Sequence, residues 1–124
     1  MSLLTRREKE ERPWGSFERF THNELSTVKI ISLKPEQELS LQKHATRSEF
    51  WRIIAGAGVV TINDAEQAAA AGADFEIPAE TPHRIKAGPE GVTFLEIALG
   101  DFDENDEIRL RDDYGRTSPA REST

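Results

Sequence analysis

Cysteine is absent from the 124-residue chain. Disulfides, thiolate nucleophiles and cysteine-based zinc sites are therefore excluded together. Histidine is scarce, because the chain contains only His22, His44 and His83. A transition-metal site would have to combine some of these imidazoles with carboxylate or amide oxygens.

Basic residues are outnumbered by acidic ones, 16 against 23, and the formal net charge is -7. This balance argues against binding to a nucleic-acid backbone, which depends on neutralising phosphates. No stretch approaches the roughly 20 apolar residues that cross a bilayer, so we expect no membrane partner. The N-terminus has no apolar run of the kind found in secretory signals, so we expect a cytoplasmic protein.

The length fits one domain. Residues 5–12 alternate in charge, which predicts a flexible arm, frayed or helical, over residues 1–11. The apolar pattern that begins at Arg12 predicts a folded domain over residues 12–116. The final segment is small and polar, so residues 117–124 are predicted to be disordered.

Short apolar runs separated by turn residues recur through the domain, which predicts an all-β barrel or sandwich. Glycines at 56–58 and the Gly88-Pro89 pair predict turns that separate strands. The alanine-rich stretch over residues 65–71 is ambiguous, and we favour a short strand over a helical turn. The expected strands cover residues 27–33, 39–44, 49–55, 59–62, 75–77, 84–86 and 92–99.

Four polar residues stand out by their joint spacing. Gln42 and His44 share one face of a predicted strand, Glu49 begins the next strand, and His83 follows a turn held by two prolines. Each residue by itself is more often a hydrogen-bonded structural group or a solvated charge than a metal ligand. Together they offer two imidazoles, a carboxylate and an amide oxygen, which suit a divalent metal ion with open positions for a substrate.

This spacing resembles the paired motifs of the cupin superfamily. His44, Glu49 and Gly56 match the first motif, in which Gln42 stands at the position of the first histidine. Gly72, Pro78 and His83 match the second motif. The resemblance implies a single cupin barrel, which is a double-stranded β-helix or jelly roll. It also implies that Gln42, His44, Glu49 and His83 hold a divalent metal ion, with Zn, Mn, Fe, Co and Ni all open.

A narrower resemblance covers nearly the whole domain. The chain is similar to the C-terminal mannose-6-phosphate isomerase domain, of type II, in bifunctional enzymes that also carry mannose-1-phosphate guanylyltransferase activity. In that family a glutamine replaces the first cupin histidine, as Gln42 does here. The guanylyltransferase half would need far more residues, so only the isomerase-like half is expected. The residues that carry the resemblance are Arg12–Ser16, Leu39–Gln42, Arg47–Trp51, Ile77–Ala79, Thr81–Arg84 and Asp113–Arg116.

The resemblance implies a metal-dependent aldose–ketose isomerase acting on a sugar phosphate through an enediolate that the metal stabilises. Arg47 and Arg84 adjoin the ligands in sequence, so they are candidates for catalysis and for binding the phosphate, with Arg116 as a further substrate-binding candidate. Glu96 lies on an otherwise apolar strand and is the candidate base. Alternatively, the arginines form surface ion pairs and Glu96 pairs with Lys29 or an arginine.

An enzyme is the favoured interpretation, and two others stay open. Thr46, Phe50 and Ala98 occupy positions that are usually polar in the family, which favours a non-catalytic sugar- or metabolite-binding cupin. Two imidazoles and a carboxylate also suit iron, so oxygenase chemistry is the third interpretation. The expected partner is a small sugar phosphate, and a homodimer formed through sheet edges is possible.

Overall fold

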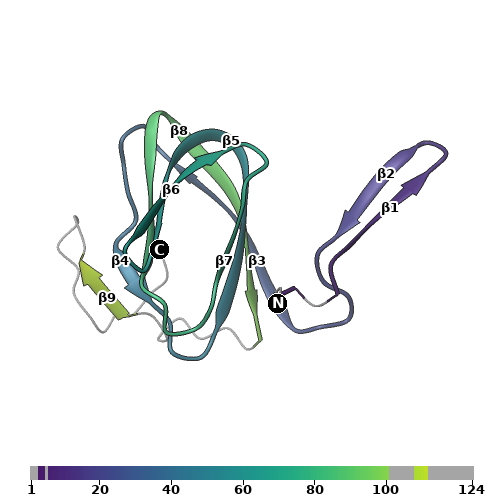
Figure 1. The fold of residues 1–124 in the computed structure, drawn as a ribbon, viewed down its shortest axis with the longest axis horizontal. Helices are drawn as coiled ribbons and strands as arrows, with labels where there is room; N and C mark the ends of the chain where they lie inside the picture. The colour runs from purple at the N-terminus through teal and green to yellow at the C-terminus, as the bar shows by residue number, and fades with distance from the viewer. Residues whose placement is uncertain (1–2, 5, 101–107, 112–124) are drawn as a thin grey trace.

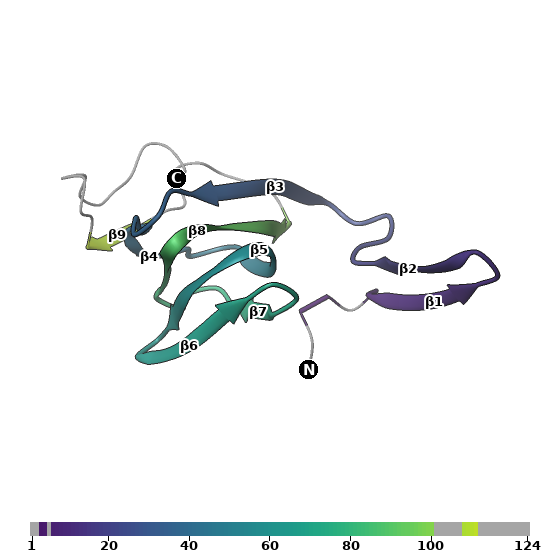
Figure 2. The same cartoon turned by 90° about the horizontal axis from the view of Figure 1, so that it is seen from above.

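The computed structural model describes residues 3–4, 6–100 and 108–111. Strands dominate this part of the chain and close into a barrel, from which one hairpin projects (Figure 1; Figure 2). The all-β prediction is confirmed. None of the described segments is a helix long and apolar enough to cross a membrane. The strands are β1 (Glu8–Arg12), β2 (Gly15–Arg19), β3 (Ser26–Leu33), β4 (Leu41–Lys43), β5 (Ser48–Ile62), β6 (Ala65–Ala70), β7 (Asp74–Ile77), β8 (His83–Leu99) and β9 (Ile108–Arg111).

Strands β5 and β8 run through the glycines that were predicted to be turns. They pair along their lengths, with register shifts between Ile53 and Ala55 and between Gly56 and Gly58. A Cβ atom on Gly56 would come within 2.2 Å of the Gly91 carbonyl oxygen. The prediction of separate strands is therefore wrong, because these glycines permit a close backbone crossing and a bend instead of a chain reversal.

The bend divides the barrel into two layers. On one side, β8 pairs with β3 and β5 pairs with β7. On the other side, β8 pairs with β4 and β5 pairs with β6. Strand β6 is the short strand that was predicted for the alanine-rich stretch. Inward-facing side chains from both layers form the core, chiefly Trp51, Ile53, Val60, Ile77, Ile85 and Phe94.

The N-terminal segment differs from the frayed or helical arm predicted from its charges. Strands β1 and β2 form an antiparallel hairpin in which Glu8 lies opposite Arg19 and Lys9 opposite Glu18. Two charges of β1 therefore lie opposite residues of opposite sign on β2, a pairing that residues 5–12 do not reveal by themselves. The predicted tail over 117–124, and the predicted domain end at residue 116, lie outside the described residues.

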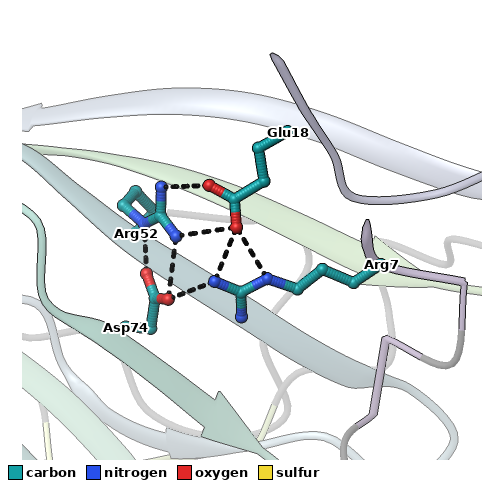
Figure 3. A network of polar contacts seen from close by, with 4 residues as sticks. All are labelled: Arg7, Glu18, Arg52 and Asp74. Carbon is teal, nitrogen blue, oxygen red and sulfur yellow. Dashed lines mark hydrogen bonds and ion pairs between the residues drawn. The ribbon is translucent and has the colours of Figure 1, made fainter. Parts of the chain in front are cut away.

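An ionic network joins the base of this hairpin to the outer face of the barrel (Figure 3). Arg7 Nη2 lies 2.7 Å from Asp74 Oδ2, and Arg7 Nε donates to Glu18 Oε2 at 2.9 Å. Arg52 of β5 bonds both Glu18 and Asp74. Hydrogen bonds from Arg52 and Arg7 lower the pKa of Glu18 despite the opposing effect of burial, so the carboxylate stays ionised in the network.

Candidate metal centre

The end of the barrel near β4 holds a cluster of buried polar side chains. Gln42 on β4 lies opposite His83, the first residue of β8, and Glu49 is the second residue of β5. His44 follows β4 directly. All four are at most 3% exposed. Alternation along the strand that turns Gln42 inward also turns Ser40 and His44 inward, so the cluster follows from local strand geometry.

Three of these side chains are close enough to share one ion. The ligand atoms of His44, Glu49 and His83 all lie within 4.8 Å of one another. His44 Nε2 is 3.4 Å from Glu49 Oε2, and His83 Nε2 is 3.5 Å from Glu49 Oε1. Two imidazoles and one carboxylate in this arrangement are a ligand set that divalent transition metals favour.

A backbone contact sets the orientation of His83. Its Nδ1 lies 2.8 Å from the Thr81 carbonyl oxygen, which accepts hydrogen bonds but cannot donate them. Nδ1 therefore carries a proton, and in the neutral ring the lone pair is on Nε2, which faces Glu49. This is the second-sphere contact by which a ligating histidine is usually oriented toward a metal.

One oxygen of Glu49 supports the same interpretation. Oε2 accepts a hydrogen bond from Arg47 Nε at 3.0 Å, whereas the buried Oε1 has no hydrogen-bond partner. A buried carboxylate oxygen without a donor is costly unless a cation completes its environment. Gln42 donates its amide nitrogen to Ser40, so its amide oxygen is the atom that could ligate. The residues present thus fit a divalent metal ion.

Electrostatics keep Glu49 ionised. Burial opposes its charge, but the close approach of His83 and the charges of His44, His83 and Arg47 outweigh that effect and lower the pKa of Glu49 to about 2. A carboxylate that is ionised before a cation arrives need not lose a proton on binding.

The environment of Glu96 has the opposite effect, because it raises the pKa of that carboxyl group. It is buried on β8, opposite Trp51 of β5 and Lys29 of β3, and accepts a hydrogen bond from the Trp51 indole at 3.2 Å. Burial, followed by repulsion from the nearby Glu49 carboxylate, raises the pKa of Glu96 to about 8, against weaker opposing effects of Lys29 and Arg47. Two carboxyl groups on neighbouring strands thus have strongly different proton affinities, a pattern common at catalytic sites.

The three candidate arginines are placed differently. Arg47 is buried in the cluster, where its Nη2 also lies 3.4 Å from His44 Nε2. Arg84 follows His83 on β8, so its side chain points to the other face, where it pairs with Glu38 at 3.2 Å. Arg84 thus forms an ion pair, which was the alternative to a role in binding the phosphate. Arg116 lies outside the described residues.

Sequence reasoning missed the supporting residues Ser40 and Thr81. Each lies two positions before a candidate ligand, Gln42 and His83 respectively, and orients it. Their spacing was visible in the sequence. Their roles depend on a side-chain or backbone oxygen being turned toward the ligand, which the residue types do not indicate.

Comparison with known proteins identifies the domain. A family model described as "Mannose-6-phosphate isomerase C-terminal" matches residues 2–113. The chain belongs to this family. It is 34% identical over 107 residues to mannose-1-phosphate guanylyltransferase ManC of Salmonella typhimurium, covering 85% of this chain and 22% of that protein. This member of the family thus corresponds to less than a quarter of the length of that relative.

Solved structures agree on the fold. The chain superposes on oxalate decarboxylase from Bacillus subtilis with a TM-score of 0.65 and 30% identity, covering 70% of this chain and 24% of that one. Another structure of that enzyme concerns its Mn(II) centres. A cupin protein from Bacteroides fragilis superposes with a TM-score of 0.56 and 23% identity, covering 63% of this chain and 70% of that one. The predicted cupin barrel is confirmed.

Proposed function

We propose that this domain is a metal-dependent aldose–ketose isomerase that interconverts mannose 6-phosphate and fructose 6-phosphate. The observation that carries the proposal is the buried cluster of His44, Glu49 and His83, in which Glu49 Oε1 lacks a hydrogen-bond donor. Membership of the mannose-6-phosphate isomerase C-terminal family supports the choice of substrate.

Gln42, His44, Glu49 and His83 would hold the divalent ion, whose identity is open among Zn, Mn, Fe, Co and Ni. The bound ion would supply Lewis-acid chemistry, polarising the substrate oxygens at C1 and C2 and offsetting the negative charge that develops between them. The protein's part is to keep this site dry and to fix its ligands, which the low exposure of all four residues supports.

Glu96 is the proton carrier in this proposal. Its carboxylate takes the proton from C2 of the aldose and returns a proton to C1, while the hydroxyl proton on O2 passes to O1, which yields the ketose. A pKa of about 8 lies close to neutral pH, where a carboxyl group can both accept and release a proton. The Trp51 indole, which donates to Glu96 Oε2 at 3.2 Å, holds the carboxyl in place.

Arg47 has two roles in the proposal. Its Nε holds Glu49 Oε2 at 3.0 Å, which leaves Oε1 to face the His83 imidazole. Its positive charge in a buried site also favours a negatively charged substrate. Of the three candidate arginines, Arg47 is the one that the described part of the chain places at the cluster, so it is the preferred phosphate or charge partner.

A non-catalytic sugar-phosphate-binding cupin is the second candidate, and Ala98 favours it. Ala98 lies opposite Glu49 in the β5–β8 register and is buried, so a polar family residue there would have been close to the cluster. Phe50 carries less weight, because its ring packs on the outer face with Leu4 and Ile97 and away from the site.

A coupled assay from mannose 6-phosphate to fructose 6-phosphate, run with each divalent ion, tests the isomerase. Turnover that is lost in Glu96→Gln while metal content is kept would support the assigned roles. Sugar-phosphate binding without turnover would instead favour the binding protein.

Elemental analysis of the protein purified without added metal tests the ligand set separately. We expect metal in the wild type and a loss of at least tenfold in a His44→Ala/Glu49→Ala double variant. An equal metal content in the two proteins would show that the ligand assignment is wrong.

A further inference from the structure

The inward face of β3 adds polar side chains to the interior of the barrel. Ile31 and Leu33 of this strand pack against the core, so strand alternation also turns Thr27 and Lys29 inward. Ile30, on the opposite face, is 67% exposed. Lys29 is half-buried, so its aliphatic stem lies in the barrel wall while its ammonium group still reaches water.

Strand register places Lys29 near the candidate metal centre. β3 pairs with β8, which in turn pairs with β5 (Figure 2). Lys29 lies opposite Glu96. Two positions away on the same face, Thr27 lies opposite Ala98, which lies opposite Glu49 on β5. Two strand spacings across and two residues along a flat sheet separate the Cα atoms of Lys29 and Glu49 by about 12 Å.

The interior thus has positive charge at two separate places. Burial and the Glu49 carboxylate raise the pKa of Glu96 to about 8, and the charge of Lys29 opposes them, so the ammonium lies close to the proposed proton carrier. Arg47 is the other lysine or arginine that the described residues turn toward the interior. It is held at the metal cluster, 3.0 Å from Glu49 Oε2 and 3.4 Å from His44 Nε2.

We propose that Lys29 binds the phosphate group of a sugar phosphate whose C1 and C2 oxygens face the metal cluster. This inference rests on the proposed function. In mannose 6-phosphate the phosphate is at the opposite end of the carbon chain from C1 and C2, so one cation cannot serve both ends. Arg47 lies where negative charge develops between C1 and C2, whereas Lys29 lies on β3, across the interior from that cluster.

The chemistry of the side chain suits this role. The chain carries a formal net charge of -7, so a phosphate dianion needs a local positive charge in order to bind. Lysine presents a compact ammonium group on a flexible four-carbon stem, which can follow a phosphate at the end of a sugar.

The proposal makes Lys29 a specificity-determining residue. Its loss should weaken the binding of a phosphorylated sugar and leave the binding of the same sugar without phosphate unchanged. A lysine that only supported the fold, or only acted on Glu96, would affect both sugars alike. The two sugars therefore distinguish a phosphate contact from a structural role.

Calorimetric titration of the purified full chain with mannose 6-phosphate and, separately, with mannose tests the proposal. We expect Lys29→Met to raise the Kd for mannose 6-phosphate roughly tenfold or more, because a charge-assisted contact is lost. The Kd for mannose should stay within about twofold of the wild type. Lys29→Gln, which keeps a polar end at this half-buried position, should behave in the same way and covers the case in which the methionine variant does not fold.

Two further variants serve as rescue and control. Lys29→Arg keeps the positive charge and should recover most of the lost affinity. Lys86→Met is the matched control, because Lys86 is an exposed lysine on β8 that alternates with the inward-facing Ile85 and Ala87. It should bind both sugars as the wild type does.

A Lys29→Gln variant that binds mannose 6-phosphate as tightly as the wild type would overturn the proposal. An equal loss of affinity for the two sugars, or a wild type with no preference for the phosphorylated one, would also overturn it. The coupled isomerase assay separates this inference from the proposed function. Lys29-dependent binding without turnover would contradict the isomerase alone, whereas turnover with an unchanged KM in Lys29→Gln would contradict the phosphate contact alone.

Discussion

Glu96→Gln should make the metal-free protein more stable at neutral and alkaline pH. In the folded wild type, burial and the Glu49 carboxylate raise the pKa of Glu96 to about 8, against an ordinary value of 4.5. Between these two pH values the unfolded chain has lost a proton that the folded protein keeps. The free energy of unfolding therefore falls as pH rises through this window, and the loss is complete above the folded pKa.

The size of the effect follows from the same two values. Each pH unit within the window is worth about 1.4 kcal/mol, so Glu96 costs the folded state about 3 kcal/mol at pH 7. Glutamine is close in shape, does not ionise and can still accept the Trp51 indole hydrogen bond. The variant should thus lack this pH dependence and exceed the wild type by a few kcal/mol at pH 8.

Urea unfolding followed by tryptophan fluorescence, in chelator, measures this difference at a series of pH values from 4.5 to 9. Glu66→Gln is the control, because Glu66 is an exposed glutamate on β6 that should leave the wild-type pH profile unchanged. Wild-type and Glu96→Gln profiles that run parallel across the window would refute the buried, proton-bearing carboxyl.

Three further perturbations test other parts of the structure. Arg47→Met leaves the buried Glu49 carboxylate without its donor and should cost about 3–5 kcal/mol in metal-free urea unfolding, whereas the partly exposed Arg84→Met should cost at most about 1 kcal/mol. Gly56→Ala brings a Cβ against the Gly91 carbonyl and should lower the thermal midpoint far more than Gly72→Ala, where φ is also positive but the space is open. Glu18→Gln should cost about 1 kcal/mol in low salt, and that loss should shrink in high salt.

Much of the candidate site could be predicted because its members are close in sequence. Strand periodicity places Gln42 and His44 on a common face, and the short turn after His44 keeps Glu49, on the next strand, near them. Only His83 comes from far along the chain. The paired cupin motifs supplied that link, and β4–β8 pairing places it opposite Gln42.

The errors have a common physical origin in pairing between distant segments. A glycine can end a strand or let it pass close to another backbone, and the approach of Gly91 to Gly56 decides between the two. Charges in residues 5–12 indicate a solvated segment, yet their partners are on β2. Neither the continuation of the strands through these glycines nor the β1–β2 hairpin can be inferred from a short window of the sequence.

The sequence by itself determined the all-β class, because local apolar periodicity expresses it. Its resemblance to the paired cupin motifs implied the family and the set of residues able to hold a metal ion. Two arginines adjoin candidate ligands in the sequence, and the tertiary structure decided which of them enters the site. Arg47 is buried beside Glu49, whereas Arg84 points to Glu38. It also decided the proton affinities of Glu49 and Glu96. Burial and the distances between charges set those affinities, and both exist only after the strands have paired.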